Sequence, residues 1–200
     1  MPAVDTVRPF LEASHLSLVA SLELFVERRI VPLATPGDDD EARLQAREIL
    51  ELLGEGGWCR WAVPGDAGAV DLRACCLIRE ALAAASPLAD SVFALQCLGA
   101  GPIVLGGDEE QRREWLPRIA DGGAMAAFAM TEPEAGSDIA AMETRARRAA
   151  EGGGWVIDGR KTLITNAGIA DLYSLFAVTG RRADGRPELS CFLVPADSDG

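Results

Sequence analysis

The sequence changes character once, at Asp121-Gly122-Gly123, and this change constrains the fold more than any other feature. Before it, apolar residues recur every three or four positions, which predicts helices. After it, short runs with β-branched residues alternate with sharp turns, which predicts strands. We therefore expect an α+β protein, in which an all-helical domain over residues 1–121 precedes an antiparallel β domain over residues 122–200.

Capping and turn residues divide the first domain into helices. The fourth helix lacks a polar face, which indicates that it is buried, and the glycines between 99 and 107 are expected to break it. Pro117 must kink or end the last helix. The predicted N-caps are Asp38 (with Glu41), Asp71, Ser86 (with Pro87 at the first helical position) and Asp108 (with Gln111). The predicted helices span 14 to about 33, 38–54, 72–85, 86–98 and a segment that begins at 108.

The second domain contains a strong hairpin signal. Asp158-Gly159 lies between two apolar runs over 154–165, and Asp-Gly favours a turn in which both central residues have positive φ. A second turn, at 151–154, is expected to link this hairpin back to a run at 144–150. Further strands are predicted at 124–130, 173–179 and 189–194.

Composition excludes several classes of function. Nineteen basic against 31 acidic residues leave a net charge of -12, which argues against a nucleic-acid partner. The five cysteines form no CxxC pair, and His15 is the only histidine, so a histidine-ligated metal site is not expected. We find no leader segment and no apolar run long enough to cross a bilayer, and we therefore expect a soluble, cytoplasmic protein without a membrane partner.

The stretch AFAMTEPEAGSDIAAM, residues 127–142, carries the densest cluster of polar groups. The backbone N–H groups of Met130 and Thr131 should lose their strand partners there and become free to face a ligand. Gly136 allows a tight turn, and Ser137 adds a second hydroxyl to that of Thr131. The residues alone leave three readings open: a structural turn, a cradle for an anion, or a Ca²⁺ or Mg²⁺ site. No GxGxxG and no GxxxxGK[ST] motif is present.

Several motifs in the same order resemble acyl-CoA dehydrogenases. AMTEPEAGSDIAA is similar to the signature of that family, and GGWVIDGRKTLITNAG is similar to its second flavin-contacting segment. FVERRIVPLA resembles its first helix, and GDEEQRREWLPRIADGG resembles the helix that leads into its β domain. The resemblance implies N-terminal helices, a middle β domain and a C-terminal helical bundle, with FAD as the cofactor.

Site residues follow from the resemblance. Phe128, Met130 and Thr131 would lie along the flavin ring, with Met130 and Thr131 bonding its pyrimidine edge. Gly136 shapes the turn, and Ser137 would contact the pyrophosphate and line the way to the acyl thioester. The other side of the ring would be covered by Leu163, Ile164 and Thr165, with the Thr165 hydroxyl near flavin N5. The family commonly has an aromatic residue in place of Leu163, which stacks better on a flavin. Glu132 and Asp138 would shape the loop rather than bind a metal.

The resemblance also implies a reaction and partners. A carboxylate base removes the α-proton of an acyl-CoA or acyl-carrier-protein thioester while the β-hydride passes to flavin N5, and an electron-transfer flavoprotein accepts the electrons. The protein would be a homo-oligomer, either a dimer or a tetramer. Phe93 and Gln96 on the fourth helix would line the acyl pocket, although core packing explains them equally well.

No acid in the 200 residues is assigned the role of the base, which in this family belongs to the C-terminal helical domain and is expected beyond Gly200. Glu132 is a conceivable but unfavoured alternative. The segment alone is expected to be inactive as a dehydrogenase. Alternatives are an acyl-CoA oxidase or flavin monooxygenase of the same fold, or a non-catalytic partner subunit.

Overall fold

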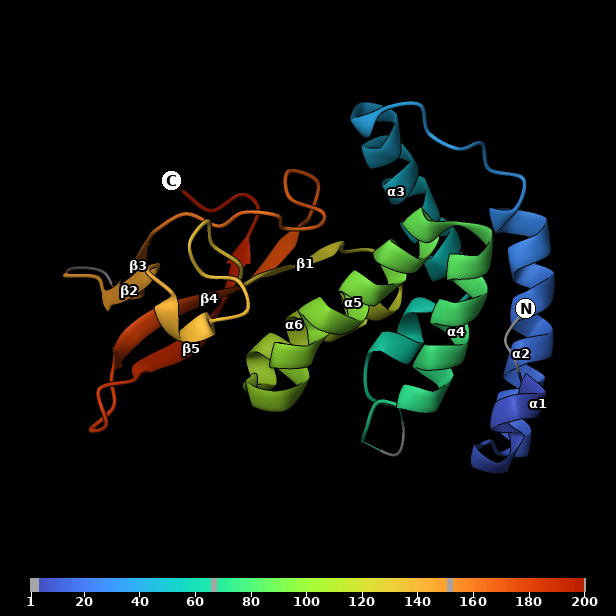
Figure 1. The fold of residues 1–200 in the computed structure, drawn as a ribbon, viewed down its shortest axis with the longest axis horizontal. Helices are drawn as coiled ribbons and strands as arrows, with labels where there is room; N and C mark the ends of the chain where they lie inside the picture. Colours follow the sequence, from blue (N-terminus) through green and yellow to red (C-terminus); the bar gives the residue numbers. More distant parts are fainter. Residues whose placement is uncertain (1–3, 66–67, 151–152, 200) are drawn as a thin grey trace. The chain divides into compact units, whose positions relative to one another are not determined.

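The chain folds into two compact units, Met1–Met125 and Ala126–Gly200 (Figure 1). The computed structural model describes residues 4–65, 68–150 and 153–199. The first unit contains helices and the second contains the strands, which confirms the predicted α+β class. The predicted boundary, between 121 and 122, falls in the turn just before this division.

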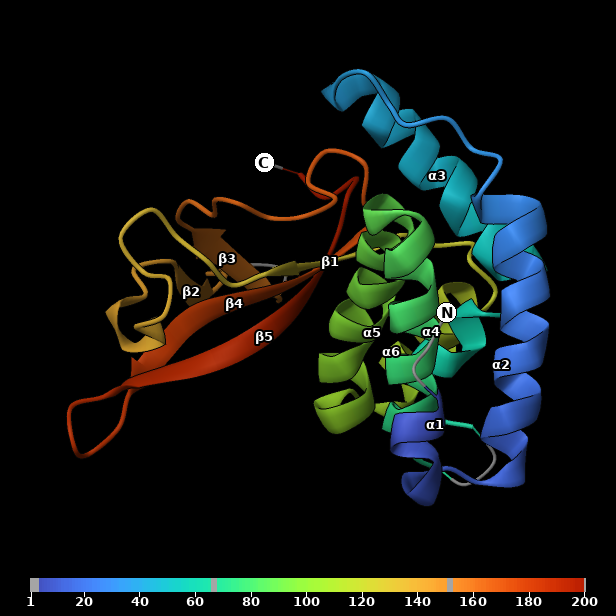
Figure 2. The same cartoon turned by 45° about the vertical axis from the view of Figure 1, so that its right-hand side comes forward.

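The helical unit is organised around one long helix. Helix α5 packs against α3, α4, α6 and the short helix η3, and α2 packs on α4 (Figure 2). The large side chains that are fully buried include Phe93 and Ile103 of α5 and Leu22 of α2. The elements of this unit are α1 (Val4–Val7), η1 (Arg8–Phe10), α2 (Ala13–Phe25), the π-helical η2 (Val26–Ile30), α3 (Asp39–Glu55), η3 (Cys59–Ala62), α4 (Leu72–Ala85), α5 (Pro87–Gly106) and α6 (Glu109–Ala120).

All four predicted N-caps are confirmed. Each of Asp38, Asp71, Ser86 and Asp108 accepts a hydrogen bond from a backbone N–H in the first turn of its helix. Asp108 and Gln111 form the complete reciprocal box, whereas the carboxylate of Glu41 accepts from Gly37 N, 2.7 Å away, instead of from the cap residue. These local bonds satisfy N–H groups that have no partner inside the helix.

Two predicted helix breaks are wrong. Helix α5 does not end at Leu98 but continues through the glycines and Pro102 to Gly106, because Ala100 and Ile103 are buried and tertiary packing overrides weak local propensity. Helix α6 likewise does not end at Pro117 but continues to Ala120, with Ile119 fully buried beyond the proline. A kink at Pro117, the other expected outcome, stays a prediction. Contrary to expectation, the length and composition of α5 would allow it to cross a membrane. Half of this apolar segment is buried inside the structure, however. Core helices of globular proteins share these properties.

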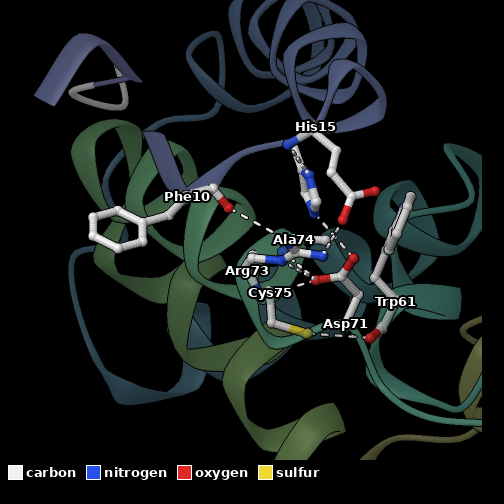
Figure 3. Close-up of polar contacts among 8 residues, drawn as sticks. Phe10, His15, Trp61, Asp71, Arg73, Ala74 and Cys75 are labelled. Atoms are coloured by element: carbon white, nitrogen blue, oxygen red, sulfur yellow. Dashed lines mark hydrogen bonds and ion pairs between the residues drawn. The ribbon is translucent and has the colours of Figure 1, made fainter. Parts of the chain in front are cut away.

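The lone histidine, His15, connects the start of helix α2 to the start of helix α4 (Figure 3). His15 is 2% exposed, and its Nδ1 accepts from Glu12 N at 3.0 Å while its Nε2 lies 3.0 Å from Asp71 Oδ2. Arg73 extends the network by donating to Glu12 Oε1 at 2.8 Å and to the carbonyl of Phe10 at 3.2 Å. These bonds hold the start of α2 against the start of α4, so His15 has a structural role.

The β unit contains one mixed sheet in which β4 is central. β4 pairs antiparallel with β5 but parallel with β1 and, at one position, with β2, so the predicted all-antiparallel arrangement is wrong. β2 and β3 form the antiparallel pair expected around the turn at 151–154, of which residues 151 and 152 lie outside the described range. The elements are β1 (Ala126–Ala129), η4 (Ile139–Ala141), β2 (Arg145–Arg148), β3 (Trp155–Asp158), β4 (Leu172–Arg181) and β5 (Pro187–Pro195).

The predicted hairpin at Asp158-Gly159 is also wrong. β3 ends at Asp158, and the chain then crosses as a loop until β4 begins at Leu172. Gly159 is required for another reason, since a Cβ there would lie 2.6 Å from the Cα of Thr144. The glycine therefore allows a close approach of two backbones and does not form a turn.

Candidate functional site

The candidate site consists of two loops of the β unit, residues 130–138 after β1 and 159–168 after β3. The loops are bonded directly to each other, because Thr162 N donates to the carbonyl of Thr131 at 3.0 Å. Lys161 Nζ donates to the carbonyl of Met130 at 3.0 Å and to Glu132 Oε1 at 2.8 Å. The structure thus brings together the two segments in which the sequence predicts cofactor contacts.

Glu132 is the centre of this arrangement. Its side chain is almost fully buried, and its carboxylate accepts from Glu143 N at 2.6 Å, from Thr144 N at 3.0 Å and from Lys161. Burial alone would raise the pKa of Glu132, but the bonds from Lys161, Thr144 and Glu143 outweigh it and lower the pKa to about 2. With its oxygens engaged and so low a pKa, Glu132 is a poor general base, as the sequence indicated.

The end of β1 offers two backbone donors. Within the described part of the chain, the N–H groups of Met130 and Thr131 donate to no protein acceptor, which agrees with the prediction that they lose their strand partners. The side chains of both residues are half-buried. One position before the strand ends, the ring of Phe128 packs against that of Phe176 with centroids 5.1 Å apart. This edge combines adjacent N–H groups with apolar surface, which suits a planar heterocycle that carries carbonyl groups.

The first loop turns back through exposed residues. Gly136 and Ser137 are exposed, and Asp138 caps η4 by accepting from Ala140 N at 3.1 Å. Asp138 and Glu132 therefore shape the loop, as predicted. Among the described residues, no group of three or more His, Cys, Asp or Glu side chains could hold a metal ion, so the structure gives the cation reading no support.

The second loop presents its residues in an unusual backbone conformation. Leu163 has φ of 54° and is 88% exposed, and Thr165 is exposed beside the half-buried Ile164. A left-handed conformation is costly for a leucine, and such strain collects at functional sites. Asn166, with φ of 68°, fixes the loop to β1 by donating from Nδ2 to the carbonyl of Ala126 at 3.0 Å.

Two positioning residues, Lys161 and Asn166, were not among those expected from the sequence. Both lie inside the motif GRKTLITNAG, but neither Lys nor Asn carries a periodic signal that would reveal its partner. Lys161 connects the two loops through Glu132, and Asn166 connects the second loop to β1. Their role depends on contacts between positions about thirty to forty residues apart, which a local pattern does not encode.

Phe93 and Gln96 have packing roles in the helical unit. Both are fully buried, and Gln96 Nε2 donates to the carbonyl of Ala124 at 2.8 Å and to that of Ile119 at 3.4 Å. Gln96 thereby holds the end of α6 and the following turn against α5. Their assignment to an acyl pocket stays a prediction.

Comparison with known proteins agrees with the motifs. The N-terminal domain model of acyl-CoA dehydrogenases matches residues 12–123, and the middle domain model matches residues 127–200. The chain is 36% identical to a probable acyl-CoA dehydrogenase of Mycobacterium leprae over 194 residues, which cover 95% of this chain and 48% of that protein. The chain therefore spans about half the length of the curated relatives that it matches.

Solved structures have a similar fold. A glutaryl-CoA dehydrogenase from Mycobacterium smegmatis superposes with a TM-score of 0.81 at 30% identity, covering 98% of this chain and 49% of the other. A structure of a glutaryl-CoA dehydrogenase from the same organism, in complex with FADH2, gives a TM-score of 0.79 at 31% identity, covering 96% and 48% of the two chains.

Proposed function

Because the chain belongs to the acyl-CoA dehydrogenase family, we propose that it supplies the flavin-binding part of an enzyme that introduces an α,β double bond into an acyl thioester. One observation carries this proposal. The free N–H groups of Met130 and Thr131 lie on a loop that is bonded, through Thr131 and Glu132, to the loop that presents Leu163 and Thr165. A flavin ring needs hydrogen-bond donors at its pyrimidine edge and apolar cover on its face, and these two loops offer both.

Each residue of the site would make a different contact with the cofactor. Met130 N and Thr131 N would donate to the carbonyl groups of the flavin pyrimidine ring, and the Thr165 hydroxyl would donate near N5. Leu163 would cover the ring without stacking on it. Ser137, exposed on the turn, would bond the pyrophosphate. When bound, FAD accepts the hydride from the β-carbon of the substrate.

The proton abstraction needs a group that these residues do not offer. Glu132 is buried and paired, and its pKa of about 2 makes it too weak a base for an α-proton. We propose that the base lies in a part of the protein outside these 200 residues. An acyl-CoA or acyl-carrier-protein thioester as substrate, an electron-transfer flavoprotein as acceptor and a homo-oligomeric assembly belong to the same proposal.

The proposal is tested by titrating the 200-residue chain with FAD and following flavin fluorescence and the visible spectrum. We expect weak binding that falls several-fold in Ser137→Ala and Thr165→Val, because each loses a hydroxyl that the proposal assigns to the flavin cofactor. Thr179→Val, on β4, is the matched control, since the Thr179 hydroxyl bonds Ser190 instead. Equal binding by all three variants and the unchanged chain would refute the assigned site.

A second assay addresses the reaction. Acyl-CoA added to the FAD-loaded chain should not bleach the flavin, because the proposed base lies outside these residues. Rapid bleaching would contradict the placement of the base elsewhere. Fast peroxide formation from a chemically reduced flavin would favour the oxidase alternative.

A further inference from the structure

Two cysteine thiols of the helical unit lie in contact, and the proposed flavin site uses neither of them. Cys75 is near the start of α4, and Cys97 is in the middle of α5, which packs against α4 (Figure 2). One residue, Ser86, connects the two helices, and each cysteine lies eleven positions from it. Because α5 turns back along α4 after so short a connection, equal separations bring the two cysteines to the same level. Arg79 and Asp90 hold the helices together beside them through two hydrogen bonds of 2.8 Å.

The two thiols form a chain of hydrogen bonds that ends on a backbone carbonyl. Cys97 donates to the sulfur of Cys75. Cys75 Sγ in turn donates to the carbonyl of Trp61, 3.2 Å away, and its sulfur faces that oxygen in Figure 3. A disulfide requires two cysteine side chains that point toward each other, and the contact between the two sulfur atoms meets this requirement.

The contact gives the two thiols different reactivities. The hydrogen bond from Cys97 lowers the pKa of Cys75 and outweighs burial, which acts in the opposite direction. The same hydrogen bond, together with burial, raises the pKa of Cys97. A thiolate is the form that attacks an oxidant, and a protonated thiol beside it can condense with the oxidised product. Cys97 is also partly exposed, so a small oxidant can reach the pair from solvent.

The other cysteines of the helical unit are placed differently. Cys59 is fully buried, and burial raises its pKa to about 12, so its thiol stays protonated. Cys76 is exposed, but it is the next residue of α4, and its side chain therefore projects from a different face of the helix than that of Cys75. Cys75 and Cys97 are the pair that the packing of α4 on α5 brings together.

We propose that Cys75 and Cys97 are a site of reversible oxidation, at which a peroxide converts the two thiols into a disulfide. The Cys75 thiolate attacks one oxygen of hydrogen peroxide, so that an S–O bond forms, the O–O bond breaks and hydroxide leaves. The Cys97 sulfur then attacks the sulfenic acid on Cys75, the S–S bond forms, and the second hydroxide leaves. The protons of the two thiols convert both hydroxides into water. Two thiols are thus oxidised by two electrons, and one peroxide is reduced. The new bond links α4 to α5, and a dithiol reductant reverses it.

The test is peroxide treatment of the reduced 200-residue chain without FAD, followed by mass spectrometry of its peptides under non-reducing conditions. One tryptic peptide contains both Cys75 and Cys76, so the bond is assigned in Cys76→Ser, which is also the matched control. We expect this variant and the unchanged chain to form the Cys75–Cys97 disulfide with the loss of two thiols. The urea midpoint of the helical unit should rise, because the bond restricts the unfolded chain, and dithiothreitol should restore the original value. Cys97→Ser should instead stop at a sulfenic acid on Cys75, which dimedone traps.

The other outcomes would overturn the proposal. A disulfide from Cys75 to Cys59 or to a second molecule would show that Cys97 is not its partner. Absence of the disulfide at a peroxide concentration that oxidises Cys76 in the unchanged chain would show that the pair is not a site of oxidation. Absence of the dimedone adduct in folded Cys97→Ser, checked by circular dichroism, would remove Cys75 as the attacking thiol. The samples contain neither flavin nor thioester, so failure of the dehydrogenase proposal would leave this result unaffected.

Discussion

The buried pair of Glu132 and Lys161 gives the sharpest prediction, because it connects both loops of the candidate site. Glu132→Gln keeps the shape of the side chain but removes the charge, and it turns an amide group toward N–H donors that now contact a carboxylate. The fall in the pKa of Glu132 from 4.5 to about 2 corresponds to about 3 kcal/mol of stability. Breaking a buried ion pair from one side costs a similar amount, about 3–5 kcal/mol. We therefore expect the β unit to lose about 3 kcal/mol at pH 7.

The pH dependence has a defined sign. Because the pKa of Glu132 is lower in the folded state, its stabilisation is present above pH 4.5 and is lost as the pH falls through about 2. The difference between Glu132→Gln and the unchanged chain should therefore shrink between pH 4.5 and pH 2. Hydrogen exchange with mass spectrometry across a urea series measures this, since it follows peptides of the β unit separately.

Glu134→Gln is the matched control for this prediction. Glu134 is exposed two positions away, and its substitution should change stability by less than about 0.5 kcal/mol. Combining Glu132→Gln with Lys161→Met should cost less than the sum of the two single changes, because each removes the same contact. A loss below about 0.5 kcal/mol for Glu132→Gln at pH 7, or a loss that stays constant down to pH 2, would refute the reasoning.

Three further predictions concern single positions. His15→Gln should lower the stability of the helical unit by about 1–3 kcal/mol. The imidazole ¹⁵N signals of the one histidine should show the Nε2–H tautomer, since Nδ1 accepts from Glu12 N. An Nδ1–H tautomer would contradict the network. Gln96→Leu should lower the stability of the helical unit by about 1–3 kcal/mol in urea unfolding, because it removes the buried side-chain donor to the carbonyls of Ala124 and Ile119. An unchanged midpoint would count against the packing role. Leu163→Gly should raise the stability of the β unit by up to about 1 kcal/mol, because glycine adopts the left-handed backbone conformation without strain. The same change should weaken FAD binding. A loss of stability would show that the leucine is not strained.

Short sequence patterns correctly predicted where most helices of the helical unit begin. Caps such as Asp71 and Ser86 act through bonds to residues two or three positions away, so a short window of sequence contains all the information. The helix ends considered near Gly99 and at Pro117 do not occur, because helix propensity is a weak prior and the burial of Ile103 and Ile119 decides where the helices end. Burial of this kind depends on neighbours from other helices, which a local pattern does not specify.

The direction of the strands was beyond the reach of local patterns. β1 and β4 are parallel and more than forty residues apart in sequence, so no turn signal connects them. The Asp158-Gly159 dipeptide pointed correctly to a position that requires glycine, but the reason for the glycine is not a hairpin turn. Its glycine is required by the close approach of Thr144, which lies just before β2.

The second loop shows why the local pattern and the family motif led to different expectations for the same residues. As a strand, Leu163 would have alternated with its neighbours and been bonded in a sheet; the structure instead turns its backbone to φ of 54° and leaves the side chain exposed. A glycine would remove that cost, and an exposed leucine gains nothing from packing that would compensate for it. Asn166 and Thr162 hold the loop in place at both ends through bonds to β1 and to Thr131. Because the surroundings hold this strained residue in position and its apolar side chain is exposed, we infer that a ligand covers that side chain. In the proposed enzyme that partner is the flavin ring, and the predicted loss of FAD binding in Leu163→Gly follows from the same argument as its gain in stability.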